Sequence, residues 1–133
     1  MTELSEPTLA ERIEAIEQAY EFMLAYAAQG REDEDGGSIR QFLQRAAAAL
    51  EGLGTAASAS AQARNATGSR EALAAFLEVF EEDARKARAA LQLVLVQKSI
   101  GSQLVDNLNA SIHLRALLTD VFLIDEALKR GEG

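Results

Sequence analysis

The stretch that decides the fold is residues 69–130, which read SREALAAFLEVFEEDARKARAALQLVLVQKSIGSQLVDNLNASIHLRALLTDVFLIDEALKR. Apolar residues recur in it every three or four positions, and good helix formers fill most of the positions between them. This spacing predicts helices over about 69–98 and 102–130. The sequence Ser-Ile-Gly-Ser at 99–102 offers a break between them. A single rod of roughly 90 Å stays open as an alternative, but two helices are favoured because they suit a compact bundle.

The same periodicity extends to the N-terminal half of the chain. An apolar stripe, with Thr8 and Glu11 as a capping box ahead of it, predicts a helix over about 7–29. A second stripe predicts a helix over about 38–53. Residues 55–68 contain no large apolar side chain, so this segment is expected to be a mobile linker, with a transient helix over 56–63 as an open alternative.

These elements place the chain in the all-α class, and its 133 residues suit a single domain. We expect a four-helix antiparallel bundle or a dimer built from long helical hairpins. The two helices predicted within 69–130 carry more large apolar side chains than one face of each helix needs. Because a second chain usually covers such a surplus, the sequence predicts a homodimer held through its third and fourth helices.

The negative charge of the chain is concentrated in its first quarter. Residues 1–35 hold ten acidic residues and two arginines, which gives −8, and the remaining residues sum to zero. This balance argues against nucleic acid as a partner, because nucleic-acid affinity comes mainly from Lys and Arg on phosphates. It favours a basic protein partner attracted by electrostatic steering. The residues predicted to bind that partner are Glu14, Glu17, Glu21, Glu32, Asp33, Glu34 and Asp35.

Residue types that carry chemistry are scarce. The chain has no cysteine and a single histidine, His113, which has no acidic residue one helical turn away to orient it. The acidic turn at 32–37 fails as a calcium loop, because neither of its glycines places a glutamate at the twelfth position. No glycine-rich phosphate loop occurs, and no acidic residue can be placed on a buried helix face. We therefore expect no catalytic residue, no metal site, no cofactor and no enzymatic activity.

The leading hypothesis is a non-enzymatic accessory, assembly or regulatory factor that works through protein contacts. The alternative is a helical bundle that binds a small molecule or cofactor in an apolar pocket between helices. The candidate residues of that pocket are Phe76, Phe80, Asn107, Asn109, His113 and Phe122. The phenylalanines fit an ordinary core equally well. A thermal shift with apolar ligands would distinguish the two hypotheses.

No segment of the sequence predicts export or a membrane span. The N-terminal sequence MTELSE is acidic, where a signal peptide is basic and then apolar. The longest nearly apolar stretch, residues 91–96, is far shorter than the roughly 20 residues that a transmembrane helix needs. We therefore expect a cytoplasmic protein that does not interact with membranes.

Overall fold

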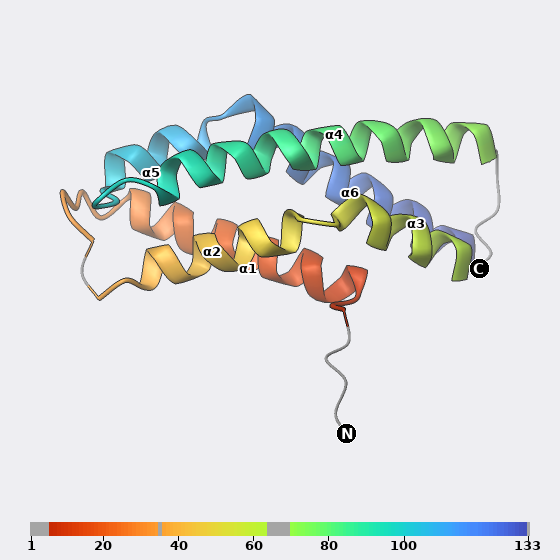
Figure 1. Ribbon diagram of the computed structural model, residues 1–133, viewed down its shortest axis with the longest axis horizontal. Coiled ribbons are helices and arrows are strands. Elements are labelled where there is room, and N and C mark those ends of the chain that lie inside the picture. Colours follow the sequence, from red (N-terminus) through yellow and green to blue (C-terminus); the bar gives the residue numbers. More distant parts are fainter. Residues whose placement is uncertain (1–5, 35, 64–69, 133) are drawn as a thin grey trace, which may run out of the picture.

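The computed structural model describes residues 6–34, 36–63 and 70–132. These residues form six α-helices and no β-strand, which confirms the all-α class (Figure 1). The helices are α1 (Leu9–Ala27), α2 (Ser38–Leu50), α3 (Leu53–Ala63), α4 (Arg70–Leu95), α5 (Ser102–Asn109) and α6 (Ile112–Glu132). In this described part of the chain, no helix is long and apolar enough to cross a membrane.

The described helices pack side by side along one long axis (Figure 1). α1 packs mainly on α2 and α5, whereas α4 packs on α2, α3 and α6. α2 and α3 follow one another in one direction, and so do α5 and α6. The largest fully buried side chains of the shared core include Met23, Ile39, Leu43, Leu53, Phe80, Leu91, Ile100 and Leu117. They come from α1 to α4, from α6 and from the turn before α5, so one core joins all these elements.

The first predicted helix is observed as α1, whose bounds lie inside the predicted range 7–29. Its N-terminus has the expected capping box. The amide of Glu11 donates to the hydroxyl of Thr8 at 3.1 Å, and the amide of Thr8 donates to the carboxylate of Glu11 at 2.8 Å. The apolar stripe behind this cap, with Ile13 and Met23, is buried. Local capping and burial of one face therefore explain α1.

The mobile linker predicted at 55–68 is wrong over most of its length, because a helix, α3, occupies it. Gly52 has a φ of 79°, which favours glycine, and separates α2 from a new helix that begins at Leu53. Ala57 and Ala61 are buried in the core, and α3 packs on α4. Small side chains pack closely enough to stabilise a helix that a search for large apolar residues does not find. The rest of the predicted linker lies outside the described residues.

The C-terminal half contains three described helices where two were expected. The break predicted at 99–102 is present, since α4 ends at Leu95, so the single rod is wrong. A further break at Ala110 and Ser111 divides the predicted helix 102–130 into α5 and α6. The apolar periodicity continues across this second break, which is why the sequence did not reveal it. The four continuous helices of the expected bundle are therefore not observed.

Candidate functional site

The acidic residues predicted to bind a partner are divided between a helix and a turn. A row of carboxylates is exposed on α1 and consists of Glu14, Glu17 and Glu21. Their spacing of three and four residues places them on one side of that helix. Glu32 and Asp33 are exposed in the turn between α1 and α2, and Asp35 lies outside the described residues. The exposed row on α1 is the larger part of the predicted docking surface.

Glu34 differs from these residues because it is engaged within the chain. Its carboxylate accepts hydrogen bonds from Nη2 of Arg40 at 2.7 Å and from Nε of Arg40 at 3.1 Å. It also accepts the amide of Ile100 at 3.0 Å, and its side chain is only 14% exposed. The hydrogen bonds from Arg40 lower the pKa of Glu34. We therefore assign Glu34 to the fold and remove it from the docking surface.

Glu34 and Arg40 belong to a polar network that joins the α1–α2 turn to the α4–α5 turn. Arg40 also donates to the carbonyl oxygens of Leu95 at 2.5 Å and Gln97 at 2.9 Å. These contacts occupy carbonyl groups that the end of α4 leaves without helical partners. The acidic turn thus holds the break after α4 in place.

Tyr26 and Ser102 extend the same network into the core. The hydroxyl of buried Tyr26 donates to the carbonyl of Ile100 at 2.5 Å, and burial raises the pKa of Tyr26. The hydroxyl of Ser102 donates to the carbonyl of Tyr26 at 2.7 Å. A side chain at Gly101 would lie 2.8 Å from the carbonyl oxygen of Glu32, so glycine allows the two turns to meet. We call Tyr26, Glu34, Arg40 and Ser102 the turn network.

The six residues predicted to line a ligand pocket do not surround one cavity. Phe80 is fully buried in the core, and Phe76 stacks on it with ring centroids 6.2 Å apart. Phe122 is 58% exposed. His113 and Asn107 are also exposed. The remaining residue, Asn109, is half-buried and its amide donates to the carbonyl of Met23 at 3.4 Å. The structure brings together only the two phenylalanines of α4, and it places them as core residues.

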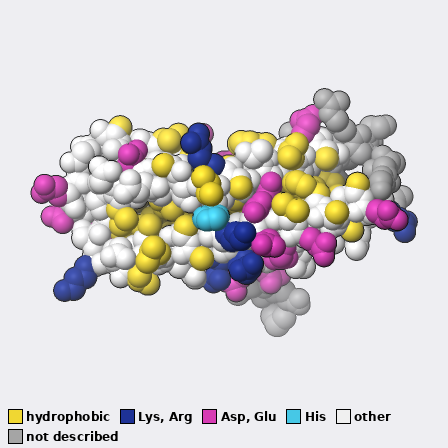
Figure 2. All heavy atoms as spheres, turned by 90° about the horizontal axis from the view of Figure 1, so that it is seen from above, with side chains coloured by type: hydrophobic (Ala, Val, Ile, Leu, Met, Phe, Trp, Pro, Cys, Tyr) yellow, Lys and Arg dark blue, Asp and Glu magenta, His cyan; other side chains and the backbone are white. Residues whose placement is uncertain are grey.

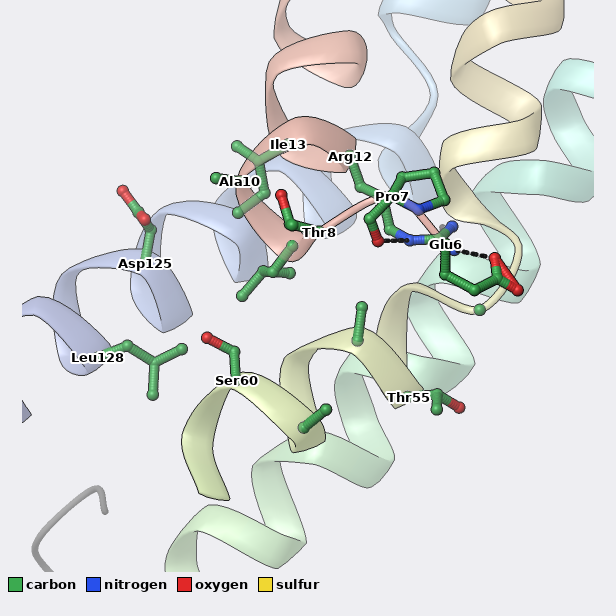
Figure 3. A pocket seen from close by; sticks show the side chains of 14 residues that line it. Glu6, Pro7, Thr8, Ala10, Arg12, Ile13, Thr55, Ser60, Asp125 and Leu128 are labelled. Carbon is green, nitrogen blue, oxygen red and sulfur yellow. Dashed lines mark hydrogen bonds and ion pairs between the residues drawn. The ribbon is translucent and has the colours of Figure 1, made fainter. Parts of the chain in front are cut away.

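A hollow of about 620 Å³ lies instead between the start of α1, α3 and the end of α6 (Figure 3). We call it the α3–α6 groove. Its lining is largely apolar and includes Leu9, Ile13, Ala56, Ala59 and Leu128. Polar residues Thr55, Ser60 and Asp125 also line it. Its size falls within the range of ligand pockets.

The groove lies beside the N-terminal end of α1. In Figure 1, α1 begins short of the right-hand end of the molecule, whereas α3 and α6 continue toward that end. Among the described helices, α3 and α6 both pack on α4 but hardly on each other. The space between them is therefore left open where α1 has not yet begun.

Arg12 closes one end of the groove without offering a free charge. It is 8% exposed, and its Nη1 donates to the carbonyl oxygens of Ala49 at 3.1 Å and Glu51 at 2.5 Å. These carbonyls belong to the end of α2, so Arg12 caps that helix. Its Nη2 lies 3.6 Å from the carboxylate of Glu6. The burial of Arg12 could have been predicted from the sequence, because Arg12 is one helical turn before Ile16 on the apolar face of α1.

A buried carboxyl pair lies between α4 and α6, where none was expected. Asp120 of α6 is 7% exposed, and its Oδ2 has no hydrogen-bond partner. Burial raises the pKa of Asp120 to about 7, and the hydrogen bond and negative charge of Asp83 on α4 add to the rise. Asp120 lies three residues after Leu117 and four before Ile124, both buried. This spacing could have indicated from the sequence that Asp120 is buried.

The described residues contain no group of three or more histidine, cysteine or acidic side chains that could hold a metal ion. The Asp83–Asp120 pair therefore has no third metal-ligating side chain beside it among these residues. Comparisons with protein-family models, with curated proteins and with solved structures found no match for this chain. The function is therefore inferred from the geometry of the chain itself.

The surface of α4 and α6 carries unusual apolar exposure. The large hydrophobic side chains that are exposed among the described residues are Leu24, Val79, Leu93, Val96, Ile112, Phe122 and Leu123. All but the first lie between residues 79 and 123. Figure 2 looks onto this side of the molecule and shows hydrophobic side chains in separate groups on both sides of the histidine, with charged side chains directly beside it. The ion pair of Lys86 with Glu82, 3.3 Å apart, lies between Val79 and Leu93 on α4.

Four of these side chains border the seam between the two helices. Val79 is one turn before Asp83 on α4, and Leu123 is one turn after Asp120 on α6, and the two aspartates meet across the seam. Helical periodicity places Leu93 on the same side of α4 as Val79, and Ile112 on the same side of α6 as Leu123. We call Val79, Leu93, Ile112 and Leu123 the outer α4–α6 face.

Proposed function

We propose that the chain is a non-enzymatic interaction protein that self-associates through the outer α4–α6 face. The single observation that supports this proposal is the exposure of large apolar side chains on that face. Leu93 is 67% exposed, Ile112 is 74% exposed and Leu123 is 56% exposed. Burying apolar surface contributes roughly 25 cal/mol per Å², so a second copy that covers this face gains from each of them. A symmetric dimer uses the same surface on both chains.

A second part of the proposal concerns a basic protein partner. The exposed row of Glu14, Glu17 and Glu21 gives α1 an outer face of one charge sign, which steers a positively charged surface toward it. We propose an accessory, assembly or regulatory role on this basis. A cytoplasmic location stays a prediction from the sequence. The small-molecule alternative is the second candidate: the residues first assigned to its pocket are dispersed, but the α3–α6 groove has the volume of a ligand pocket.

Sedimentation velocity of the full chain tests self-association. The variant is Leu123→Glu, which puts a charge on the outer α4–α6 face, and the matched control is Leu24→Glu on α1, where the leucine is 49% exposed. We expect the wild type and the control to sediment as dimers and Leu123→Glu as a monomer that keeps the helical circular dichroism of the wild type at 25 °C. A monomeric wild type, or equal dissociation by both substitutions, would contradict the proposal.

A further inference from the structure

The α3–α6 groove lies where a bundle would hold another helix. α1 has 19 residues and α4 has 26, so at 1.5 Å per residue they are about 28 Å and 39 Å long. The difference corresponds to about two helical turns. α1 begins only at Leu9, and its first residues line the groove together with α3 and α6. A short helix placed there would continue the direction of α1.

The walls of the groove suit the apolar face of such a helix. α3 presents Ala56, Ala59 and Ser60, whose small side chains let another backbone approach closely. Ile13 of α1 and Leu128 of α6 are buried and form the floor of the groove, and Figure 3 shows Leu128 and Ser60 on the two sides of the space between α6 and α3. A helix in a groove is held by apolar anchors at positions i, i+3 or i+4, and i+7, which two turns provide.

The charge around the groove favours a basic occupant. Glu6 lines it with a side chain that is 89% exposed, and Glu11 and Glu14 continue the acidic surface along α1. The cation of the lining, Arg12, is buried and donates to carbonyl oxygens at the end of α2. The positive end of the α1 dipole is already offset by Glu11, whose carboxylate accepts the amide of Thr8. Among the described residues around the groove, carboxylates outnumber cations even though Glu6 is paired with Arg12 at 3.6 Å, so this described part of the surface disfavours an anionic occupant.

We propose that the α3–α6 groove binds a short amphipathic helix with basic flanking residues, supplied by a partner protein. This inference rests on the basic partner of the proposed function and names the element by which that partner binds. Its apolar face would fill the groove beyond the start of α1. Its Lys or Arg residues would face the carboxylates of Glu6 and Glu11.

The test uses two labelled synthetic peptides and measures binding by fluorescence anisotropy. One peptide has leucines at helical spacing and lysines at the other positions, and the second has glutamates in place of the lysines. The blocking variant is Ala59→Trp, which fills the groove. The matched control is Ala48→Trp at an exposed position of α2 that does not line the groove. If Ala59→Trp does not fold, Ser60→Trp replaces it.

The lysine peptide should bind the wild type and the control alike, and about tenfold more weakly to the blocked variant, a difference of about 1.4 kcal/mol. The glutamate peptide should bind the wild type at least about tenfold more weakly than the lysine peptide. Equal binding to wild type and blocked variant, or equal binding of both peptides, would overturn the inference. So would saturation by decanol that the lysine peptide cannot displace, since this would identify a small apolar ligand.

Sedimentation separates this inference from the proposed self-association. The Ala59→Trp variant should sediment as the wild type does, because the groove is away from the outer α4–α6 face. If Leu123→Glu dissociates the dimer but the lysine peptide binds Ala59→Trp as tightly as the wild type, only the groove assignment fails. If the peptide result holds and the wild type is a monomer, only self-association fails.

Discussion

The two ends of the molecule differ in how completely their polar groups are hydrogen-bonded and how closely their helices pack. At the turn end, the turn network pairs Glu34, Arg40, Tyr26 and Ser102 with groups inside the chain. At the groove end, α3 and α6 hardly touch. Between α4 and α6, outside the groove, the buried Asp120 has an oxygen without a hydrogen-bond partner. Buried polar groups stabilise a fold only when they are paired, so the turn end is the more firmly held of the two ends.

The turn end and the α4–α6 seam should also respond to pH in opposite directions. Arg40 lowers the pKa of Glu34, so the stability from that carboxylate is present above the ordinary carboxyl pKa and is lost as the pH falls through the lowered value. Burial raises the pKa of Asp120 to about 7. Because the unfolded chain releases that proton near pH 4, stability from this group falls as the pH rises from about 4 to about 7.

Arg40→Ala should have the largest effect on stability. It removes the ion pair with Glu34 and the hydrogen bonds that Arg40 donates to the carbonyl oxygens of Leu95 and Gln97. We therefore expect the free energy of unfolding to fall by about 3 kcal/mol. Urea unfolding measures it. The control is Arg85→Ala at an exposed position of α4, with a change below about 0.5 kcal/mol. Equal losses would contradict a special role for the turn end.

Asp120→Asn should act in the opposite direction at the α4–α6 seam. It removes the buried carboxyl, so the variant should be more stable than the wild type by about 2 kcal/mol at pH 7.5, with little difference at pH 4. Urea unfolding across this pH range measures the change. Asp106→Asn, at an exposed position of α5, serves as the control. Parallel pH profiles for wild type and Asp120→Asn would show that the carboxyl does not titrate as described.

Tyr26→Phe should cost less than the change at Arg40. It removes a single hydrogen bond, from the hydroxyl to the carbonyl of Ile100, and leaves that buried acceptor unpaired, so we expect a loss of about 1 kcal/mol. Thermal unfolding compares it with Tyr20→Phe at a half-buried position of the same helix. If both tyrosine substitutions cost the same, the network does not depend on this bond.

The combined substitution Glu14→Gln, Glu17→Gln and Glu21→Gln should change stability least, by less than about 0.5 kcal/mol. The three side chains are exposed, so they contribute little to the fold. Their charge should instead set how salt affects binding of the lysine peptide. Stopped-flow association at several salt concentrations should show a flatter dependence in the variant. An unchanged dependence would remove this row from the docking surface.

The large apolar features of the fold could be predicted from the sequence. The stripe and capping box of α1 are local patterns, and so is the Ser-Ile-Gly-Ser break after α4. α3 was expected at most as a transient helix over 56–63, because its burial depends on Ala57 and Ala61, which no hydrophobic pattern distinguishes from exposed alanines. Its stability comes from contact with α4, distant in sequence. Tertiary packing overrides local propensity here.

The polar residues of the candidate site were harder to predict. Arg12 and Asp120 lie at the spacing of buried rows, but charged residues are usually exposed. Glu34 resembles its acidic neighbours in the sequence, and only the approach of Arg40 and Ile100 gives it another role. The groove itself follows from where α1 begins relative to α3 and α6. Such properties depend on how distant segments meet.

The mass of the wild-type chain in solution, measured by static light scattering over a dilution series, tests self-association most directly. Two copies that cover the outer α4–α6 face should give twice the 14.3 kDa of one chain at high concentration. A mass of one chain at every concentration would contradict self-association.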